Sequence, residues 1–450
     1  RLRSHFENLA PHCLELDNID LTPGAPGFEP LDLQPEQPWA IVFTSGSTGV
    51  PKGVLLSEAN LLHQVRMLTG QPGLIGGKDR ALNLLPLHHV YPFTAATLTP
   101  LAAGCPIVYP RSLRGEDIAA ACREERISIL IVVPQVLTAL NRRILDQAAE
   151  QPLPVRLAFK ALAALGGIGI NRGLRPGKYL FRSVHSRFPS LRFAACGGAR
   201  LEAETHRSLA RLGFRIVEAY GLSETAPVVC LNSLERPVFG SVGQAAPGVS
   251  VRIERTDPAL DEGEVLVKGP NVTAGYYRNP EATREAFTAE GWLRTGDLGR
   301  LDPHGNLFLT GRSKEVLVLP SGKNIYPEEL EKVYERSPLV GEICLCLTGG
   351  RGEERLTAVV APAREELARR RSTRVLEDIK FDLENLARAL PSYQRVTRVL
   401  LYGEPFPRTR LGKLRRWRLP PVWRGRISNM KLPGRQALPG MSFWSSSGNT

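Results

Sequence analysis

Short apolar runs alternate with longer amphipathic stretches through the first half of the chain. Residues 82–85, 106–109 and 129–133 are apolar runs with the length and composition of buried strands. Residues 118–126 and 135–148 instead repeat apolar positions three and four apart, as helices do. Strands that alternate with helices predict an α/β domain with a largely parallel sheet. Further elements are predicted at 178–187 (a basic amphipathic helix), 191–195 and 214–218 (strands) and 202–212 (a helix).

The pattern differs at the start of this region and again after it. Residues 39–43 form a short apolar strand candidate, a Gly/Ser/Thr loop follows, and Ser57 is a good N-cap for a helix. After Gly240, glycine and proline become frequent between short strands at 249–254 and 263–268. This second pattern indicates a β-rich subdomain.

A smaller α/β unit begins after Arg312. It has a helix that opens at Pro327, strands near Ile343 and Thr357, and a helix over 375–390. We therefore predict a large domain over 1–311 with its β-rich part over 240–311, a small α+β domain over 312–420 joined by a hinge, and a disordered tail over 421–450.

Composition agrees with a soluble globular protein, since 42% of the residues are hydrophobic and 23% are charged. We find no apolar run near the roughly 18 residues that a membrane span needs, and the first residues lack the apolar segment of a signal peptide. The expected location is therefore the cytoplasm, with a peripheral contact to a membrane left open. The seven cysteines are scattered and odd in number, which argues against a disulfide framework. Cys344 and Cys346 alternate on a predicted strand, and we interpret them as ordinary residues rather than a zinc site.

The formal net charge of +13 comes mostly from the C-terminus. From Phe406 onward the chain has ten Lys or Arg and no Asp or Glu, and without those ten charges the net charge is +3. Such a tail attracts the phosphates of a nucleotide, anionic lipid or nucleic acid. Because the chain has no recognised nucleic-acid module, we expect no specific nucleic-acid partner.

The stretch with the most chemistry is residues 44–53, a loop of glycines and hydroxyl residues with Lys52 near its end. Glycines let a backbone approach an anion closely, while hydroxyls and a lysine supply donors and charge. It is not a Walker loop, because that pattern, counted from Gly46, needs glycine where Pro51 stands. On its own, a loop of this composition is equally well a flexible turn.

Five further motifs follow the loop in a fixed order. They are Gly197-Gly198-Ala199, Tyr220-Gly221-Leu222-Ser223-Glu224-Thr225, Thr295-Gly296-Asp297, Gly311-Arg312-Ser313-Lys314-Glu315 and Arg408-Thr409-Arg410-Leu411-Gly412-Lys413. With the loop they resemble the adenylate-forming superfamily of acyl-CoA synthetases, luciferases and peptide-synthetase adenylation domains. The resemblance extends over residues 35–420.

This resemblance implies that ATP adenylates a carboxylic acid, which then passes to coenzyme A. Two anions meet in the first step, so cationic groups and a metal must neutralise charge. Glu224 would bind Mg²⁺ together with Thr44, because hard oxygen ligands suit that ion. Asp297 would accept both ribose hydroxyls with Arg312 assisting, and Tyr220 would stack on adenine. The implied ATP-binding set is Thr44, Ser45, Gly46, Ser47, Thr48, Gly49, Lys52, Gly198, Ala199, Glu218, Ala219, Tyr220, Gly221, Ser223, Thr225, Asp297 and Arg312, with Ser223 or Thr225 at the α-phosphate.

Two lysines have implied roles in the two half-reactions. Lys413 resembles the family's catalytic lysine, whose compact charge would bridge the acyl carboxylate and the α-phosphate. From composition alone, Lys413 would be interpreted as one more cation of the basic tail. Lys314 falls at the family's hinge, where the small domain would rotate between adenylation and thioester formation.

The acid is implied by softer similarities. Residues 84–93 resemble the acyl-pocket segment of fatty acyl-CoA synthetases, with His89 near the carboxylate and Val90 and Phe93 lining the pocket. Residues 173–188 and 322–329 are similar to long-chain members. We therefore expect a medium- or long-chain fatty acid, although a histidine pair is also a common core feature.

The chain departs from the family pattern before residue 44, where family members usually have well over a hundred residues. A large part of the first subdomain is therefore expected to be absent, which puts activity in question. The alternatives to an acyl-CoA ligase are a ligase for acyl carrier protein, an enzyme that stops at the acyl-adenylate, and a non-catalytic homologue that binds nucleotide or acyl ligand.

Overall fold

The computed structural model describes residues 34–45, 51–255, 261–313, 316–320, 323–349, 354–370, 374–404, 406–407 and 414. The chain divides into Arg1–Gln37 and Pro38–Thr450, and the description below concerns the second unit.

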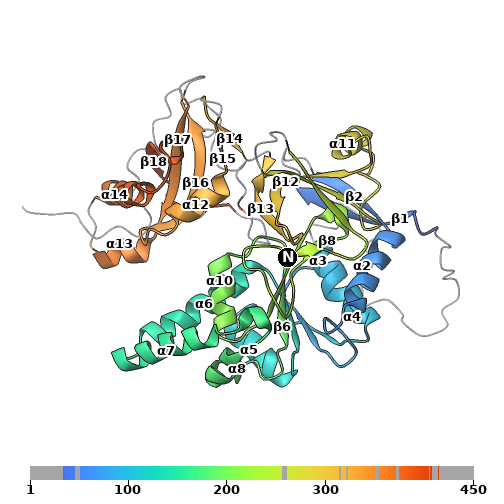
Figure 1. Ribbon diagram of the computed structural model, residues 1–450, viewed down its shortest axis with the longest axis horizontal. Helices are drawn as coiled ribbons and strands as arrows, with labels where there is room; N and C mark the ends of the chain where they lie inside the picture. The colour runs from blue at the N-terminus through green and yellow to red at the C-terminus, as the bar shows by residue number, and fades with distance from the viewer. Residues whose placement is uncertain are drawn as a thin grey trace, which may run out of the picture. The chain divides into compact units, whose positions relative to one another are not determined.

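The largest sheet of the described residues has seven strands in the order β4-β3-β5-β6-β7-β8-β9. Its strands β6 and β8 are labelled in Figure 1. The strands from β4 to β7 pair in parallel, whereas β8 and β9 add antiparallel pairs at one edge. The pattern of alternating strands and helices is therefore confirmed as an α/β fold. The strands are β3 (Ala81–Asn83), β4 (Ile107–Val108), β5 (Ile129–Val132), β6 (Phe193–Cys196), β7 (Ile216–Gly221), β8 (Val228–Leu231) and β9 (Gln244–Ala245).

Both faces of this sheet are buried, as parallel sheets require. Successive side chains of a strand point to opposite faces, so Leu130 and Ile131 enter two different apolar clusters. The Leu130 cluster packs against α5, α6 and α10, and the Ile131 cluster packs against the α3 region. The helices around the sheet are α2 (Glu58–Gly70), α3 (Val90–Phe93), α4 (Thr99–Ala102), α5 (Gly115–Glu124), α6 (Pro134–Ala149), α7 (Leu153–Gly166), α8 (Pro176–Leu180), α9 (Arg182–His185) and α10 (Ala203–Arg211).

The predicted helix start at Ser57 is confirmed. The Ser57 side chain accepts a hydrogen bond from the Asn60 backbone N–H, and the Asn60 side chain accepts one from the Ser57 backbone. This reciprocal capping box satisfies two amide donors at the end of α2.

Two helix predictions are corrected. Helix α7 was not predicted, and Leu153–Arg172 is long and apolar enough to span a membrane by length and composition, contrary to our expectation that no such run exists. The basic helix expected over 178–187 is split into α8 and α9 at Phe181. Phe181 is buried against the Phe159 ring at 5.2 Å between centroids, and its backbone leaves the helical region there.

The β-rich and C-terminal regions form separate sheets. Strands β10 (Ser250–Glu254), β11 (Gly263–Lys268), β12 (Leu293–Leu301) and β13 (Leu307–Arg312) make an antiparallel sheet, with α11 (Pro280–Ala286) inserted before β12. The elements after Arg312 are β14 (Leu317–Val318), β15 (Asn324–Ile325), α12 (Pro327–Tyr334), β16 (Val340–Thr348), β17 (Arg355–Pro362), α13 (Arg364–Arg370), α14 (Val375–Ala387) and β18 (Arg398–Leu401). Cys344 and Cys346 are buried on β16 in an apolar cluster with Val359 and Phe406. The predicted domain limits stay predictions.

Candidate active site

Three of the predicted motifs lie at one edge of the seven-stranded sheet. Since β3, β6 and β7 run parallel, the segments that follow them, 84–93, 197–199 and 222–225, lie at the carboxyl ends of the strands. Ligands of open α/β sheets bind at this edge. Two of the segments meet directly: Tyr91 donates a hydrogen bond to the Ala195 carbonyl at 3.0 Å, and its ring lies where a side chain on Gly197 would stand.

The predicted phosphate loop is bracketed by an antiparallel hairpin of β1 (Pro38–Ser45) and β2 (Pro51–Ser57). Thr44 pairs with Lys52 in this hairpin, and the Thr44 hydroxyl donates to the Lys52 carbonyl at 3.4 Å. Backbone hydrogen bonds attach β2 to a later segment, with Leu55 N donating to Gly275 O and Tyr277 N donating to Gly53 O. Gly46, Ser47, Thr48 and Gly49, and the side chain of Ser45, lie outside the described residues.

Glu224 belongs to a half-buried polar group that we call the Glu224 cluster, which consists of Lys52, Glu224 and Tyr276. The Tyr276 hydroxyl donates to Glu224 Oε1 at 2.9 Å, and Lys52 Nζ lies 5.0 Å from the centre of the Tyr276 ring. Burial, and then the neighbouring Glu224 carboxylate, raise the pKa of Tyr276 well above 10, so its hydroxyl stays a donor. The structure thus brings the end of the phosphate loop and the predicted metal ligand to one ring.

The turn that carries Glu224 is held from several sides. Thr225 is fully buried, and its hydroxyl bonds within the turn to Leu222 and Pro227. The Gln64 and Asn271 side-chain amides both donate to the Thr225 and Val228 carbonyls. Of the two hydroxyls predicted at the α-phosphate, Ser223 is therefore the one left half-exposed, whereas Thr225 stabilises the turn.

Asp297 is buried in a polar group that we call the Asp297 cluster, which consists of Tyr220, Asp297 and the partly exposed Arg312. The Tyr220 hydroxyl donates to Asp297 Oδ2 at 2.7 Å, and Arg312 Nε donates to Oδ1 at 2.9 Å. Asp297 and Arg312 are paired residues of β12 and β13, so the sheet itself sets their distance. Burial first, and the Asp297 carboxylate next, raise the pKa of Tyr220 well above its ordinary value. Each carboxylate oxygen can accept more than one hydrogen bond, so Asp297 keeps acceptor capacity for ribose hydroxyls.

Two predicted nucleotide residues have other surroundings. The Tyr220 ring is 8% exposed in an apolar cluster, so its stacking on adenine stays a prediction. The buried Glu218 carboxylate accepts from Leu201 N at 3.1 Å and lies 3.7 Å from His206 Nδ1. Gly198 adopts a left-handed φ of 85°, and Ala199 and Ala219 are half-buried.

Two of the predicted acyl residues pack in an apolar cluster of the described residues. Val90 is buried in an apolar cluster with Val54 and Leu56, so it is a core residue here. Phe93 packs against the same cluster and stacks on Trp39 at 6.2 Å between ring centres. His89 precedes α3, half-buried, with its ring 4.3 Å from the ring of His88.

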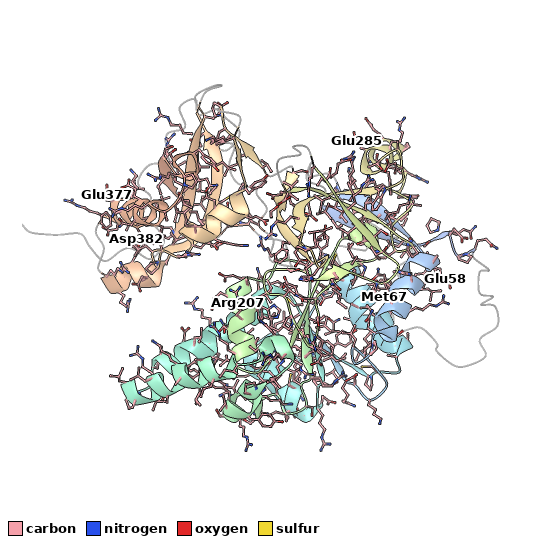
Figure 2. The ribbon with its side chains drawn as sticks, viewed as in Figure 1. Glu58, Met67, Arg207, Glu285, Glu377 and Asp382 are labelled. Carbon is pink, nitrogen blue, oxygen red and sulfur yellow. The ribbon has the colours of Figure 1, made fainter. Side chains whose placement is uncertain are left out.

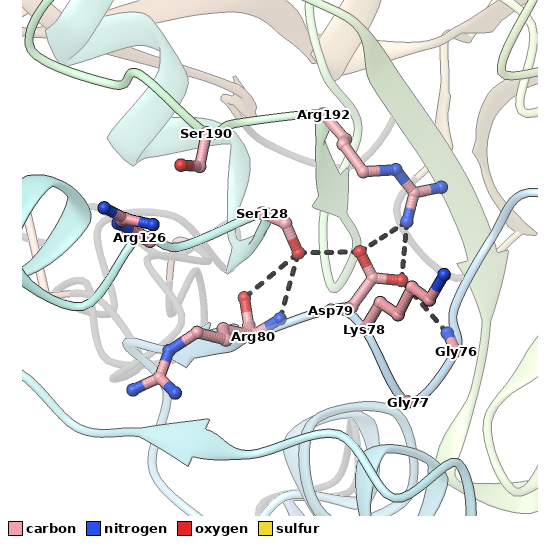
Figure 3. Close-up of a pocket in the computed structure, with 9 residues that line it drawn as sticks. All are labelled: Gly76, Gly77, Lys78, Asp79, Arg80, Arg126, Ser128, Ser190 and Arg192. Carbon is pink, nitrogen blue, oxygen red and sulfur yellow. Dashed lines mark hydrogen bonds and ion pairs between the residues drawn. The ribbon is translucent and has the colours of Figure 1, made fainter.

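The cavity of about 630 Å³ drawn in Figure 3 belongs to the opposite edge of the sheet. Its lining residues Asp79, Ser128 and Arg192 precede β3, β5 and β6. Ser128 donates to Asp79 Oδ1 at 2.7 Å, and Arg192 forms an ion pair with the same carboxylate. This network joins the amino ends of three strands and is separate from the predicted site.

Tyr276 is the site residue that the sequence did not reveal. Tyr276 is 52 positions from Glu224 in the sequence and belongs to none of the motifs described above. It reaches the site because backbone hydrogen bonds attach its segment, 273–277, to β2. Lys314 and Lys413 lie outside the described residues.

Comparison with known proteins identifies the family. Residues 7–277 match the family described as AMP-binding enzyme, and the chain belongs to this family. The resemblance found from the motifs is therefore confirmed.

The chain is similar to proteins with several named activities. It is 33% identical over 317 residues to the sulfoacetate–CoA ligase of Cupriavidus necator, covering 69% of this chain and 54% of that protein. It is 33% identical over 325 residues to the long-chain-fatty-acid–CoA ligase FadD15 of Mycobacterium tuberculosis, covering 69% of this chain and 52% of that protein. ATP-bound MatB from Rhodopseudomonas palustris superposes with a TM-score of 0.68 at 26% identity, covering 86% of this chain and 68% of MatB. The chain thus spans about half the length of the curated relatives it matches.

Proposed function

We propose that this chain activates a carboxylic acid with ATP and transfers the acyl group to coenzyme A. The observation that carries the proposal is the placement of the two polar clusters on either side of Gly221. The Tyr220 hydroxyl donates to Asp297, the predicted ribose acceptor. In the following turn, Glu224 accepts from Tyr276, whose ring also contacts Lys52 at the end of the phosphate loop. One nucleotide can then contact a ribose acceptor, a cation and a metal ligand at once.

The reaction has two balanced steps. In the first, a carboxylate oxygen of the acid attacks the α-phosphorus of ATP, and the bond to the bridging oxygen of pyrophosphate breaks. In the second, the sulfur of coenzyme A attacks the acyl carbon, and AMP leaves while the thiol proton goes to solvent or a base. Lys52 supplies positive charge near the phosphates, and Asp297 fixes the nucleotide by its sugar.

A magnesium ion fits the Glu224 cluster. Glu224 Oε1 accepts a hydrogen bond from Tyr276, and carboxylate oxygens have further lone pairs for a hard cation. Among the described residues no three His, Cys, Asp or Glu side chains gather to form a metal site. Mg²⁺ suits such a sparse site, since it keeps waters and phosphate oxygens in its shell. Glu224, with Thr44 from the hairpin, would hold the ion, which would neutralise phosphate charge when bound.

We further propose that the acid is a medium- or long-chain fatty acid. This choice is supported by the similarity to FadD15 and by the position of segment 84–93. Tyr91 of that segment contacts Gly197, the first residue of the Gly197-Gly198-Ala199 motif. The equally similar sulfoacetate–CoA ligase is named for a small polar acid, so the acid must be tested directly. Carrier protein in place of coenzyme A, and a homologue that only binds its ligands, are the alternatives.

The test is ATP–pyrophosphate exchange by the full chain with acetate, sulfoacetate, indoleacetate and C8–C18 fatty acids. Exchange that rises with chain length is expected, because each buried methylene contributes about 0.8 kcal/mol until the pocket is full. Exchange with sulfoacetate alone would overturn the fatty-acid proposal but not adenylation. No exchange with any acid, together with measurable ATP binding, would indicate a non-catalytic homologue.

The two lysines outside the described residues allow the half-reactions to be separated. Lys413→Ala should lose roughly two to three orders of magnitude in adenylate formation. It should still transfer acyl groups from supplied acyl-adenylate. Lys314→Pro should form adenylate but transfer it slowly, because proline restricts the backbone rotation at the predicted hinge. Equal loss of both half-reactions in both variants would contradict the rotation.

A further inference from the structure

Helix α7 presents apolar side chains to solvent, unlike an ordinary surface helix. Four apolar residues of α7 and one just after its end follow one another at intervals of three and four, and all are exposed: Leu153, Leu157, Ala161, Ala164 and Ile168. Leu153, Leu157 and Ile168 are 64%, 57% and 61% exposed. Figure 2 shows side chains projecting from the outer side of α7, at the lower left of the view. We call this stripe the outer face of α7.

The opposite face of the same helix is used by the fold. Phe159, Leu162 and Ala163 pack against the main apolar cluster, and the Phe159 ring meets Phe181. At its end, Gly166 is pressed so closely against neighbouring chain that an added Cβ would lie 2.1 Å from the Arg211 carbonyl oxygen. The helix is therefore fixed to the domain by one face and its C-terminal end.

The charge around this helix has one sign. Residues 151–201 contain no Asp or Glu but nine Lys or Arg. The exposed cations of α7 to α9 make no ion pair within the part of the chain that the structure describes; they are Arg156, Lys160, Arg172, Lys178, Arg182 and Arg187. Arg156 and Lys160 stand three positions after Leu153 and Leu157, so they flank the outer face of α7.

We propose that the outer face of α7, with its flanking cations, is a docking surface for an anionic membrane, on which the helix lies in the interface. Exposed apolar side chains enter the boundary between headgroups and acyl chains, and the cations bind anionic headgroups. Tyr179, 69% exposed in α8, is of the amphipathic aromatic type that prefers this boundary. The inference does not depend on the proposed function.

A spanning role for α7 fits the structure less well. Although Leu153–Arg172 has enough residues to span a membrane, its regular α-helix ends at Gly166 and Gly169 adopts a left-handed conformation. The 14 residues of the α-helix rise about 21 Å, whereas the hydrocarbon core is about 30 Å thick. The inner face of α7 and Gly166 also pack against the rest of the domain, so they are not available to lipid. A second copy of this chain would cover the apolar stripe but would bring the unpaired cations of two copies together.

The experiment measures sedimentation of the full chain with vesicles of phosphatidylcholine, with and without phosphatidylserine. One variant combines Leu153→Gln and Leu157→Gln with Leu165→Gln, since Leu165 is a further exposed leucine of α7 at 49% exposure. A second variant combines Arg156→Gln and Lys160→Gln. The control combines Lys380→Gln and Phe381→Gln, which changes an exposed cation and an exposed aromatic on α14. All keep the basic C-terminal residues, and thermal unfolding checks that each is folded.

The parent and the control should bind vesicles that contain phosphatidylserine. The Leu variant should bind at least about tenfold more weakly. The cation variant should bind roughly 25-fold more weakly, since each charge near an anionic surface contributes about fivefold. Equal binding by all variants would assign any membrane contact to other residues and overturn the proposal. Loss of self-association in the Leu variant without change in vesicle binding would identify a second copy as the partner, and resistance of the bound parent to alkaline extraction would indicate a spanning helix.

Discussion

The Asp297 cluster and the Glu224 cluster flank the same residue, Gly221, yet they are completed in different ways. In the first, both oxygens of a buried carboxylate have donors, one from Tyr220 on β7 and one from Arg312 on β13, the strand adjacent to that of Asp297. In the second, a half-buried carboxylate accepts from a tyrosine hydroxyl, and Lys52 contacts the ring of that tyrosine. A buried carboxylate that two donors hold in place offers a fixed geometry to a ligand, whereas a half-buried carboxylate with a single tyrosine donor has more acceptor capacity left for a ligand that arrives with its own charge.

The largest effect is expected where the two clusters are joined. A Cβ on Gly221 would lie 1.6 Å from the Pro227 carbonyl oxygen, so Gly221→Ala must displace the turn between Tyr220 and Glu224. We expect a loss of more than about 4 kcal/mol in the free energy of unfolding. Urea unfolding measures it, with Gly115→Ala as the control, because a Cβ there meets nothing within 4 Å. A loss equal to that of the control would show that the turn is not fixed.

The second prediction separates the clusters by function. Glu224→Gln keeps the shape and the Tyr276 contact but removes the charge, so Mg-dependent adenylate formation should fall at least about a hundredfold. Stability should change little, because Glu224 is half-exposed. Tyr276→Phe is the matched variant: it removes the donor and keeps the carboxylate, and its loss should be about tenfold. Wild-type pyrophosphate exchange by folded Glu224→Gln would refute the metal assignment.

The third prediction concerns stability in the other cluster. Asp297→Asn replaces an acceptor by an amide donor opposite either the Tyr220 hydroxyl or Arg312, leaving one group unsatisfied. Because Tyr220 is buried while Arg312 is partly exposed, we expect a loss of about 1–3 kcal/mol in the free energy of unfolding. Asp261→Asn, at an exposed carboxylate paired with Arg255, should change it by less than about 1 kcal/mol. Similar losses in both would show that the cluster adds no stability beyond a surface pair.

The sequence predicted the sheet well because buried strands are short apolar runs with clear limits, and most predicted strands lie within a few residues of the observed ones. It missed α7 because apolar residues occupy both the inner and the outer face, so helical periodicity disappears. It joined α8 to α9 because nothing local shows that Phe181 turns into the core. Ordered motifs identified Glu224, Asp297 and Arg312 as site candidates. Tyr276 and the core position of Val90 depend on tertiary packing, which no local pattern encodes.

The smallest effect is expected from the tyrosines at alkaline pH, and it compares the clusters directly. Burial and a neighbouring carboxylate raise the pKa of both Tyr220 and Tyr276 above 10. A raised folded-state pKa gives stability that is complete below the unfolded pKa of about 10 and is lost as the pH rises above it. Each tyrosine should therefore lower the free energy of unfolding by up to about 1.4 kcal/mol per pH unit in that range.

Tyr220→Phe and Tyr276→Phe should each flatten the decline measured by urea unfolding between neutral pH and pH values above 10. Tyr109→Phe, at an exposed tyrosine, should leave the decline unchanged. If Tyr220→Phe gave the same slope as Tyr109→Phe, the hydroxyl would ionise as freely in the folded chain as in the unfolded one, and the Asp297 cluster would not be the closed network described here.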